Sequence, residues 1–98
     1  MANAIMTVDE LKEILANKTP IALLDVRTQE ERQEFNIGGY HIPLSELTQR
    51  WQELPKDQTL VVYCRSGGRS QSAVDYLSER EFEDVRNLLG GMLAWKQS

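Results

Sequence analysis

The stretch VVYCRSGGRSQSA, residues 61–73, decides how this chain should fold. Its first residues end an unbroken apolar run, TLVVY (59–63), which is typical of a strand buried on both faces. After a short loop of glycines and arginines, apolar residues at helical spacing predict a helix from about Ser70 to Arg80. Strand, loop and helix in this order form the repeating unit of a parallel sheet.

Similar signals extend to both ends of the chain. A second unbroken apolar run, IALLDV (21–26), and the segment DVRNLL (84–89) predict two more strands. Capping boxes of Thr7 with Glu10 and of Thr28 with Glu31 predict two helix starts. The remaining expected elements are a short edge strand at Ile5 and Met6, a helix over 7–16, a short polar helix after Thr28, a brief strand within 38–43, a helix capped by Ser45 and ended by Pro55, and a last helix after Gly90 and Gly91. Together they predict one α/β domain over residues 1–98, with a mainly parallel sheet of about five strands and helices on both faces.

Composition limits the classes of function. The 98 residues suffice for one core without disulfides or metal, since roughly 60% of the unfolded surface is buried at this size. Fifteen acidic residues against eleven basic ones argue against nucleic acid or anionic lipid as a partner. No apolar run is long enough for a membrane span, and the start MANAIMTVDE has no leader-like pattern, so we expect a soluble chain. The chain has one cysteine and no His/Cys cluster with zinc-like spacing, so we expect no disulfide, no metal and no cofactor. The low cysteine count favours a reducing compartment, the cytoplasm.

That single cysteine, Cys64, lies where open α/β sheets bind their ligands, at the carboxyl end of a strand. A lone cysteine after an apolar strand is usually a small core residue, but the polar loop that follows favours a nucleophile. Glycines let the loop curl, so that backbone N–H groups, a helix dipole and two arginines would stabilise a thiolate. We therefore predict Cys64 as the catalytic residue. The residues expected to bind the substrate are Arg65, Ser66, Gly67, Gly68, Arg69 and Ser70.

Three motifs, LLDVR (23–27), CRSGGRS (64–70) and VRNLLGGMLAW (85–95), together resemble those of single-domain rhodaneses, which are thiosulfate or persulfide sulfurtransferases. The resemblance covers nearly the whole chain in the right order. It implies that Cys64 takes a sulfane sulfur as a persulfide, surrounded by the loop amides. It also implies a mainly structural role for Asp25 and Arg27, and a packed closing turn for GGMLAW.

One element departs from the family pattern. Many rhodaneses carry GHIPGA after the acidic helix, whereas this chain has FNIGGYHIP (35–43), with Asn36 in place of the usual histidine. The only histidine, His41, lies further along, and nothing near it in the sequence marks it as a partner of Cys64. A preformed thiolate does not need a base, so His41 is assigned no role.

Two alternatives stay open beside sulfur transfer from thiosulfate or a persulfide to a thiol, cyanide or a protein acceptor. One is a rhodanese-like module that binds a protein or carries sulfur without catalysis. The other is a cysteine-dependent phosphatase or arsenate reductase, whose loop sets an arginine after the cysteine. Four residues separate Cys64 from Arg69, one fewer than in that pattern, and the shorter loop suits a sulfur atom better than a phosphate.

Overall fold

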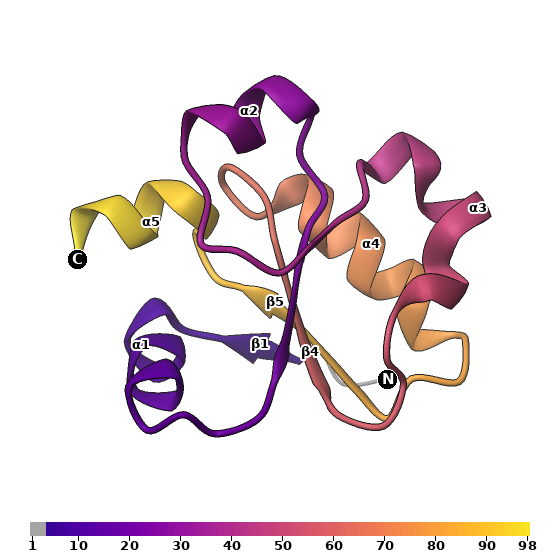
Figure 1. The fold of residues 1–98 in the computed structure, drawn as a ribbon, viewed down its shortest axis with the longest axis horizontal. Coiled ribbons are helices and arrows are strands. Elements are labelled where there is room, and N and C mark those ends of the chain that lie inside the picture. Colours follow the sequence, from indigo (N-terminus) through magenta and orange to yellow (C-terminus); the bar gives the residue numbers. More distant parts are fainter. Residues whose placement is uncertain (1–3) are drawn as a thin grey trace.

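The computed structural model describes residues 4–98, so the first three residues of the expected domain lie outside it. Five strands alternate with helices along the chain (Figure 1). In chain order the elements are β1 (Ile5–Met6), α1 (Val8–Ala16), β2 (Ala22–Asp25), α2 (Gln29–Glu34), β3 (Tyr40–His41), a 3-10 turn (Leu44–Glu46), α3 (Leu47–Arg50), a second 3-10 turn (Trp51–Glu53), β4 (Thr59–Tyr63), α4 (Gly68–Ser78), β5 (Asp84–Leu88) and α5 (Gly91–Gln97).

The strands form one sheet in the order β1-β5-β4-β2-β3, and every neighbouring pair is parallel. This confirms the predicted fold class. From β2 the chain continues to β3, at one edge of the sheet. From β4 it continues to β5, toward the opposite edge. The carboxyl ends of β2 and β4 therefore mark a switch point, where open parallel sheets bind ligands.

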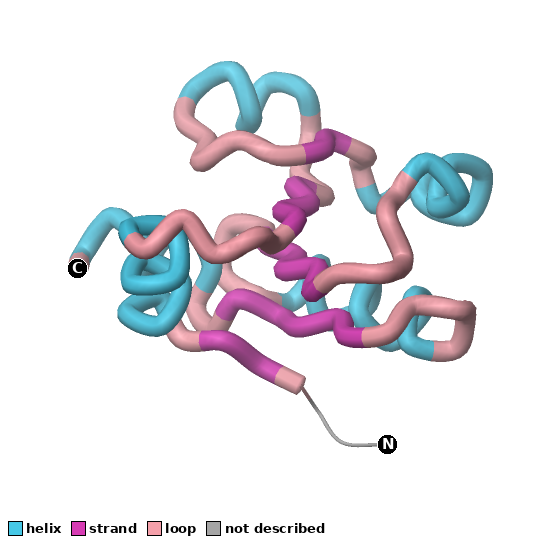
Figure 2. Tube along the Cα trace, turned by 60° about the horizontal axis from the view of Figure 1, so that its bottom comes forward, coloured by secondary structure: helices cyan, strands magenta, loops and turns pink. Residues whose placement is uncertain are grey.

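Helices lie on both faces of the sheet (Figures 1 and 2). A layer of hydrophobic side chains covers each face. Successive residues of β4 point to opposite faces of the sheet, because a strand is pleated, and so they pack in different layers. Leu60 and Val62 pack with residues of α3 and α4, and Cys64 continues this row. Val61 and Tyr63 pack on the other face with residues of α1 and α5. The pleat thus directs Cys64 toward the face that α4 covers.

Two helix starts follow the predicted capping boxes. Thr7 with Glu10 and Thr28 with Glu31 form reciprocal capping boxes at α1 and α2. The predicted cap at Ser45 is wrong: Ser45 lies inside the 3-10 turn that Pro43 begins, and no side chain caps this segment. The start of α4 also differs from the prediction, because Gly67 occupies the cap position and the helix begins at Gly68.

No helix in the described range 4–98 is long and apolar enough to cross a lipid bilayer.

Candidate active site

Cys64 directly follows β4, and its side chain is only 1% exposed. It is a free thiol in the hydrophobic layer beneath α4. The loop after it turns sharply at Gly67, whose φ of 113° lies in the left-handed region that favours glycine. This turn aims the first amides of the helix back at the sulfur.

Polar hydrogens from the loop and from α4 point at the Cys64 sulfur. The amide of Gly67 donates to Sγ over 3.0 Å, and that of Ser70 over 3.4 Å. The hydroxyl of Ser70 also lies 3.3 Å from Sγ. The sulfur therefore lies in a pocket of neutral N–H and O–H donors, at the amino end of a helix whose dipole also favours negative charge.

These donors change the acidity of the thiol. Burial raises the pKa of Cys64, because it removes water from the charged form. The hydrogen bonds from the Ser70 hydroxyl and from the amides of Ser70, Gly67 and Ser66 lower it. The hydrogen bonds outweigh burial, so the pKa of Cys64 lies below that of an ordinary cysteine. A larger fraction of the sulfur is then thiolate, the nucleophilic form, at neutral pH.

The predicted substrate-binding residues occupy three kinds of position. Arg65, Ser66 and Gly68 are exposed, while Gly67 and Arg69 are partly buried. Ser70 is fully buried beneath the sulfur. Arg65 makes no side-chain hydrogen bond or ion pair within residues 4–98, but both terminal nitrogens of Arg69 lie 2.8 Å from Glu31 carboxylate oxygens.

The other side of the loop is held by the start of α5. The amides of Met92 and Leu93 donate to the carbonyls of Cys64 and Arg65 over 2.9 and 3.0 Å. Gly91 allows this contact, since a Cβ at that position would lie 2.5 Å from the Cys64 carbonyl oxygen. The closing turn is therefore packed, as predicted, and it also ties down the backbone of the loop.

Asn87, in β5, is a buried residue that the sequence analysis did not connect with the loop. Its Nδ2 donates to the Gly67 carbonyl over 3.2 Å and to Gln71 Oε1 over 3.1 Å. Its Oδ1 accepts from the Ser70 hydroxyl over 2.5 Å. The single hydroxyl proton of Ser70 thus has two acceptors, Asn87 Oδ1 and Cys64 Sγ. Asn87 lies two residues after the buried Val85, so both side chains point to the same face of β5. An asparagine at such an inward position is the signal that could have revealed this contact, because a buried amide requires partners.

The carboxyl end of β2 carries a buried ion pair. Asp25 accepts from Nε and Nη2 of Arg27, each over 2.9 Å, and from the Arg27 amide over 3.0 Å. Arg27 also donates to the carbonyl of Phe35 over 2.7 Å. These bonds fasten the segment after α2 to β2.

The polar residues around β3 make contacts within this same segment. His41 Nε2 lies 2.8 Å from the carbonyl oxygen of Arg27, so it must be the protonated ring nitrogen there. Asn36 bonds to the carbonyl of Arg32 and to the amide of Gly38. His41 is therefore engaged by the backbone at β2 rather than by Cys64.

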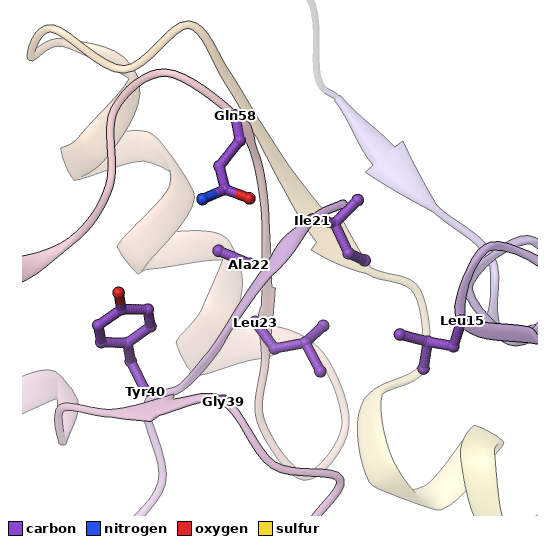
Figure 3. Close-up of a pocket in the computed structure, with 7 residues that line it drawn as sticks. All are labelled: Leu15, Ile21, Ala22, Leu23, Gly39, Tyr40 and Gln58. Atoms are coloured by element: carbon purple, nitrogen blue, oxygen red, sulfur yellow. The ribbon is translucent and has the colours of Figure 1, made fainter. Parts of the chain in front are cut away.

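One hollow in the described part of the chain lies away from the loop (Figure 3). It measures about 560 Å³ and is bordered by Leu15, Tyr40 and Gln58, among others. None of its lining residues belongs to the Cys64 loop. Within the same described range, no three His, Cys, Asp or Glu side chains are grouped so that they could hold a metal ion.

Comparison with known sequences decides the family. The Rhodanese family, described as a rhodanese-like domain, matches residues 7–98. The chain belongs to the rhodanese family. A rhodanese relative named sulfurtransferase, from Allochromatium vinosum, is 38% identical over 88 residues, which cover 89% of this chain and 82% of the relative.

Further relatives agree with this assignment. The thiosulfate sulfurtransferase GlpE of Coxiella burnetii is 34% identical over 83 residues, covering 84% of this chain and 78% of GlpE. The crystal structure of a rhodanese-related protein from Thermoplasma volcanium has a TM-score of 0.86 at 28% identity, covering 96% of this chain and 91% of that chain. The predicted resemblance is confirmed: the protein is a sulfurtransferase-like rhodanese domain with a single, buried cysteine.

Proposed function

We propose that this rhodanese moves sulfane sulfur from a donor to a thiophilic acceptor through a persulfide on Cys64. One observation carries the proposal: a buried thiol of lowered pKa lies against three neutral donors from Gly67 and Ser70. A thiolate in such surroundings is a nucleophile, and the same donors suit the negative charge of a bound persulfide.

The reaction is a double displacement. With thiosulfate as donor, the Cys64 thiolate attacks the sulfane sulfur, the S–S bond of thiosulfate breaks, and sulfite leaves with the electron pair of that bond. The products are a Cys64 persulfide anion and sulfite, so charge is conserved. A second nucleophile, such as cyanide or a thiolate, then attacks the outer sulfur and regenerates the Cys64 thiolate.

The loop residues have distinct parts in this scheme. Gly67, Ser70 and the amide of Ser66 stabilise the thiolate. Arg65 and Gly68 lie on the exposed side of the loop, where an incoming donor arrives, and Arg69 borders it. Thiosulfate or a persulfide is the proposed donor, and a thiol, cyanide or a protein is the proposed acceptor. A cytoplasmic location, favoured by the single cysteine, stays a prediction that cell fractionation would test.

A transfer assay over a panel of donors and acceptors tests the proposal. Wild-type protein should release sulfite from thiosulfate and form thiocyanate with cyanide, or persulfide with a thiol, and Cys64→Ser should do neither. p-Nitrophenyl phosphate and arsenate belong in the same panel. Absence of sulfur transfer with every pair, or robust phosphatase or arsenate reductase activity, would refute the proposal. Binding of a protein without transfer would favour a non-catalytic module.

A further inference from the structure

We propose that Glu31 selects the donor by its charge. By holding Arg69, it makes the site favour an organic persulfide, with at most one negative charge, over thiosulfate, which has two. The inference rests on the proposed sulfur transfer at Cys64. It concerns a residue in α2, 33 positions before the cysteine in the sequence.

Arg69 and Glu31 form an ion pair through two hydrogen bonds. Arg69 Nη1 lies 2.8 Å from Glu31 Oε1, and Nη2 lies 2.8 Å from Oε2. Two parallel bonds of this kind are the strongest arrangement of a guanidinium and a carboxylate. The hydrogen bond from Arg69 lowers the pKa of Glu31 to about 2, against an opposing effect of burial. The pair therefore stays ionised throughout the neutral range.

Glu31 is also fixed from its own side. Its Oε1 accepts from the amide of Thr28 over 3.0 Å in the capping box of α2. The carboxylate cannot move far without breaking this cap. An incoming anion would have to compete with an anchored carboxylate for the terminal nitrogens of Arg69.

The balance of charge at the loop also disfavours a dianionic donor. Of its two arginines, only Arg65 has no carboxylate partner in the described chain. The Cys64 thiolate and thiosulfate together bring three negative charges to one place, which a single exposed guanidinium balances poorly. An organic persulfide in its protonated form brings none. In its transfer the thiolate attacks the outer sulfur, the S–S bond breaks, and the organic thiolate leaves and takes up the proton of the persulfide.

The surface beside the ion pair is hollowed. Arg69 forms one wall of a hollow of about 350 Å³ at the carboxyl end of β2. The rest of its lining is half aliphatic, from Val26, Pro43 and Leu44, and half polar, from Arg27, Thr28 and Ser45. The guanidinium of Arg27 is already paired with Asp25. The amide of Val26 bonds to the carbonyl of Tyr63, the residue before Cys64, so the hollow and the cysteine lie on neighbouring strand ends. A carbon group fits such a hollow better than a charged sulfonate does.

Glu31→Gln is the variant that tests this inference. Glutamine keeps the side-chain oxygen that the Thr28 cap requires but removes the charge that holds Arg69. Glu30→Gln is the matched control, because Glu30 lies in the same helix, is exposed and forms no ion pair within residues 4–98. The donors are thiosulfate and 2-hydroxyethyl persulfide, with cyanide as acceptor.

In Glu31→Gln, kcat/KM for thiosulfate should rise roughly threefold to fivefold, mainly through KM, the size expected for one partly exposed charge pair. The value for 2-hydroxyethyl persulfide should change much less, and Glu30→Gln should change neither. Adding Arg69→Gln should abolish the gain. An unchanged ratio of the two donors would overturn the inference, as would an equal loss for both, which would mean that the pair only shapes the loop.

A binding measurement separates this inference from the proposed function. Sulfate, a dianion that carries no sulfane sulfur, should protect Cys64 of Glu31→Gln from iodoacetamide at several-fold lower concentration than in the wild type. Equal protection in both proteins would contradict the inference. A wild type that transfers sulfur from neither donor would refute the proposed function, and the sulfate result would still decide whether Glu31 keeps anions from Arg69.

Discussion

Cys64 and Asp25 lie at the ends of adjacent strands, and both are buried, with 1% and 0% of the residue exposed. Their partners differ in kind. Asp25 meets a cation, Arg27, through two side-chain bonds of 2.9 Å, and Nη1 of Arg32 lies 3.6 Å from its Oδ2. In the described range 4–98, the hydrogen bonds to the Cys64 sulfur come from neutral amides and a hydroxyl.

This difference separates a structural charge from a reactive one. A carboxylate neutralised by a buried guanidinium has no remaining attraction for a ligand, and its loss leaves an unpaired buried charge. A thiolate held by neutral dipoles keeps its charge and its lone pairs directed at a substrate. The comparison predicts that changes at Cys64 should act on activity, and changes at Asp25 on stability.

The largest effect is expected at the cysteine. Cys64→Ala should abolish sulfur transfer, since no other thiol exists in the chain. It should lower the free energy of unfolding by only about 1 kcal/mol, because one small side chain is lost. Transfer assays and urea unfolding measure both quantities. If Cys64→Ala kept its activity or failed to fold, the distinction between a reactive Cys64 and a structural Asp25 would be wrong.

The opposite pattern is expected at the buried ion pair. Asp25→Asn leaves the Arg27 guanidinium without its counter-charge, which should lower the free energy of unfolding by about 3–5 kcal/mol. The alkylation rate of Cys64, measured in the fraction that remains folded, should change little. If Asp25→Asn proves too unstable to study, the double variant Asp25→Asn, Arg27→Met removes both charges and should recover part of the loss. A double variant as unstable as the single one would show that charge pairing is not what Asp25 contributes.

A smaller effect is expected when one donor to the sulfur is removed. Ser70→Ala should raise the pKa of Cys64, because burial remains while the hydroxyl that favours the thiolate is lost. The profile of iodoacetamide alkylation against pH should shift to higher pH. In the wild type, the lowered pKa stabilises the fold above the pKa of the unfolded thiol, and this contribution is lost as pH falls through the folded pKa. Ser70→Ala should reduce this stabilising contribution. An unchanged profile of alkylation against pH would show that the amides alone stabilise the thiolate.

The smallest effect is expected at Asn87, which bonds to the Cys64 loop at the Gly67 carbonyl. Asn87→Ala removes the amide that bonds the Gly67 carbonyl, so the loop amides should exchange their hydrogens faster. Gln71→Ala is the control, because it removes another partner of Asn87 and leaves the bond to Gly67. Hydrogen exchange of residues 66–70 measures the effect. Equal exchange in wild type and Asn87→Ala would mean that the start of α5 alone holds the loop.

The sequence was sufficient to predict the sheet, because patterns of neighbouring residues specify it. Unbroken apolar runs predicted β2 and β4, and capping boxes predicted the starts of α1 and α2. The prediction was wrong at Ser45, since a serine has the same local signal whether it precedes a helix or lies inside a 3-10 turn. Which turn forms there depends on packing against the sheet.

The candidate site was only partly predictable, for the same reason. Cys64 and its loop are contiguous, so their position followed from the motif. The ion pair of Glu31 with Arg69 and the bonds of Asn87 join residues far apart in the chain, and no pattern of spacing specifies such contacts. In particular, Arg69 was predicted to bind the substrate, and only the structure shows that its guanidinium is paired with the carboxylate of Glu31.

The most direct test of the account is the mass of the intact protein after exposure to a sulfur donor. After treatment with excess thiosulfate or 2-hydroxyethyl persulfide and desalting, wild-type protein should be heavier by one sulfur atom, because its single cysteine leaves no internal thiol to discharge the persulfide. Cyanide should restore the original mass, and Cys64→Ser should gain nothing. Catalysed sulfur transfer with no gain of mass at donor saturation would contradict a covalent relay through Cys64.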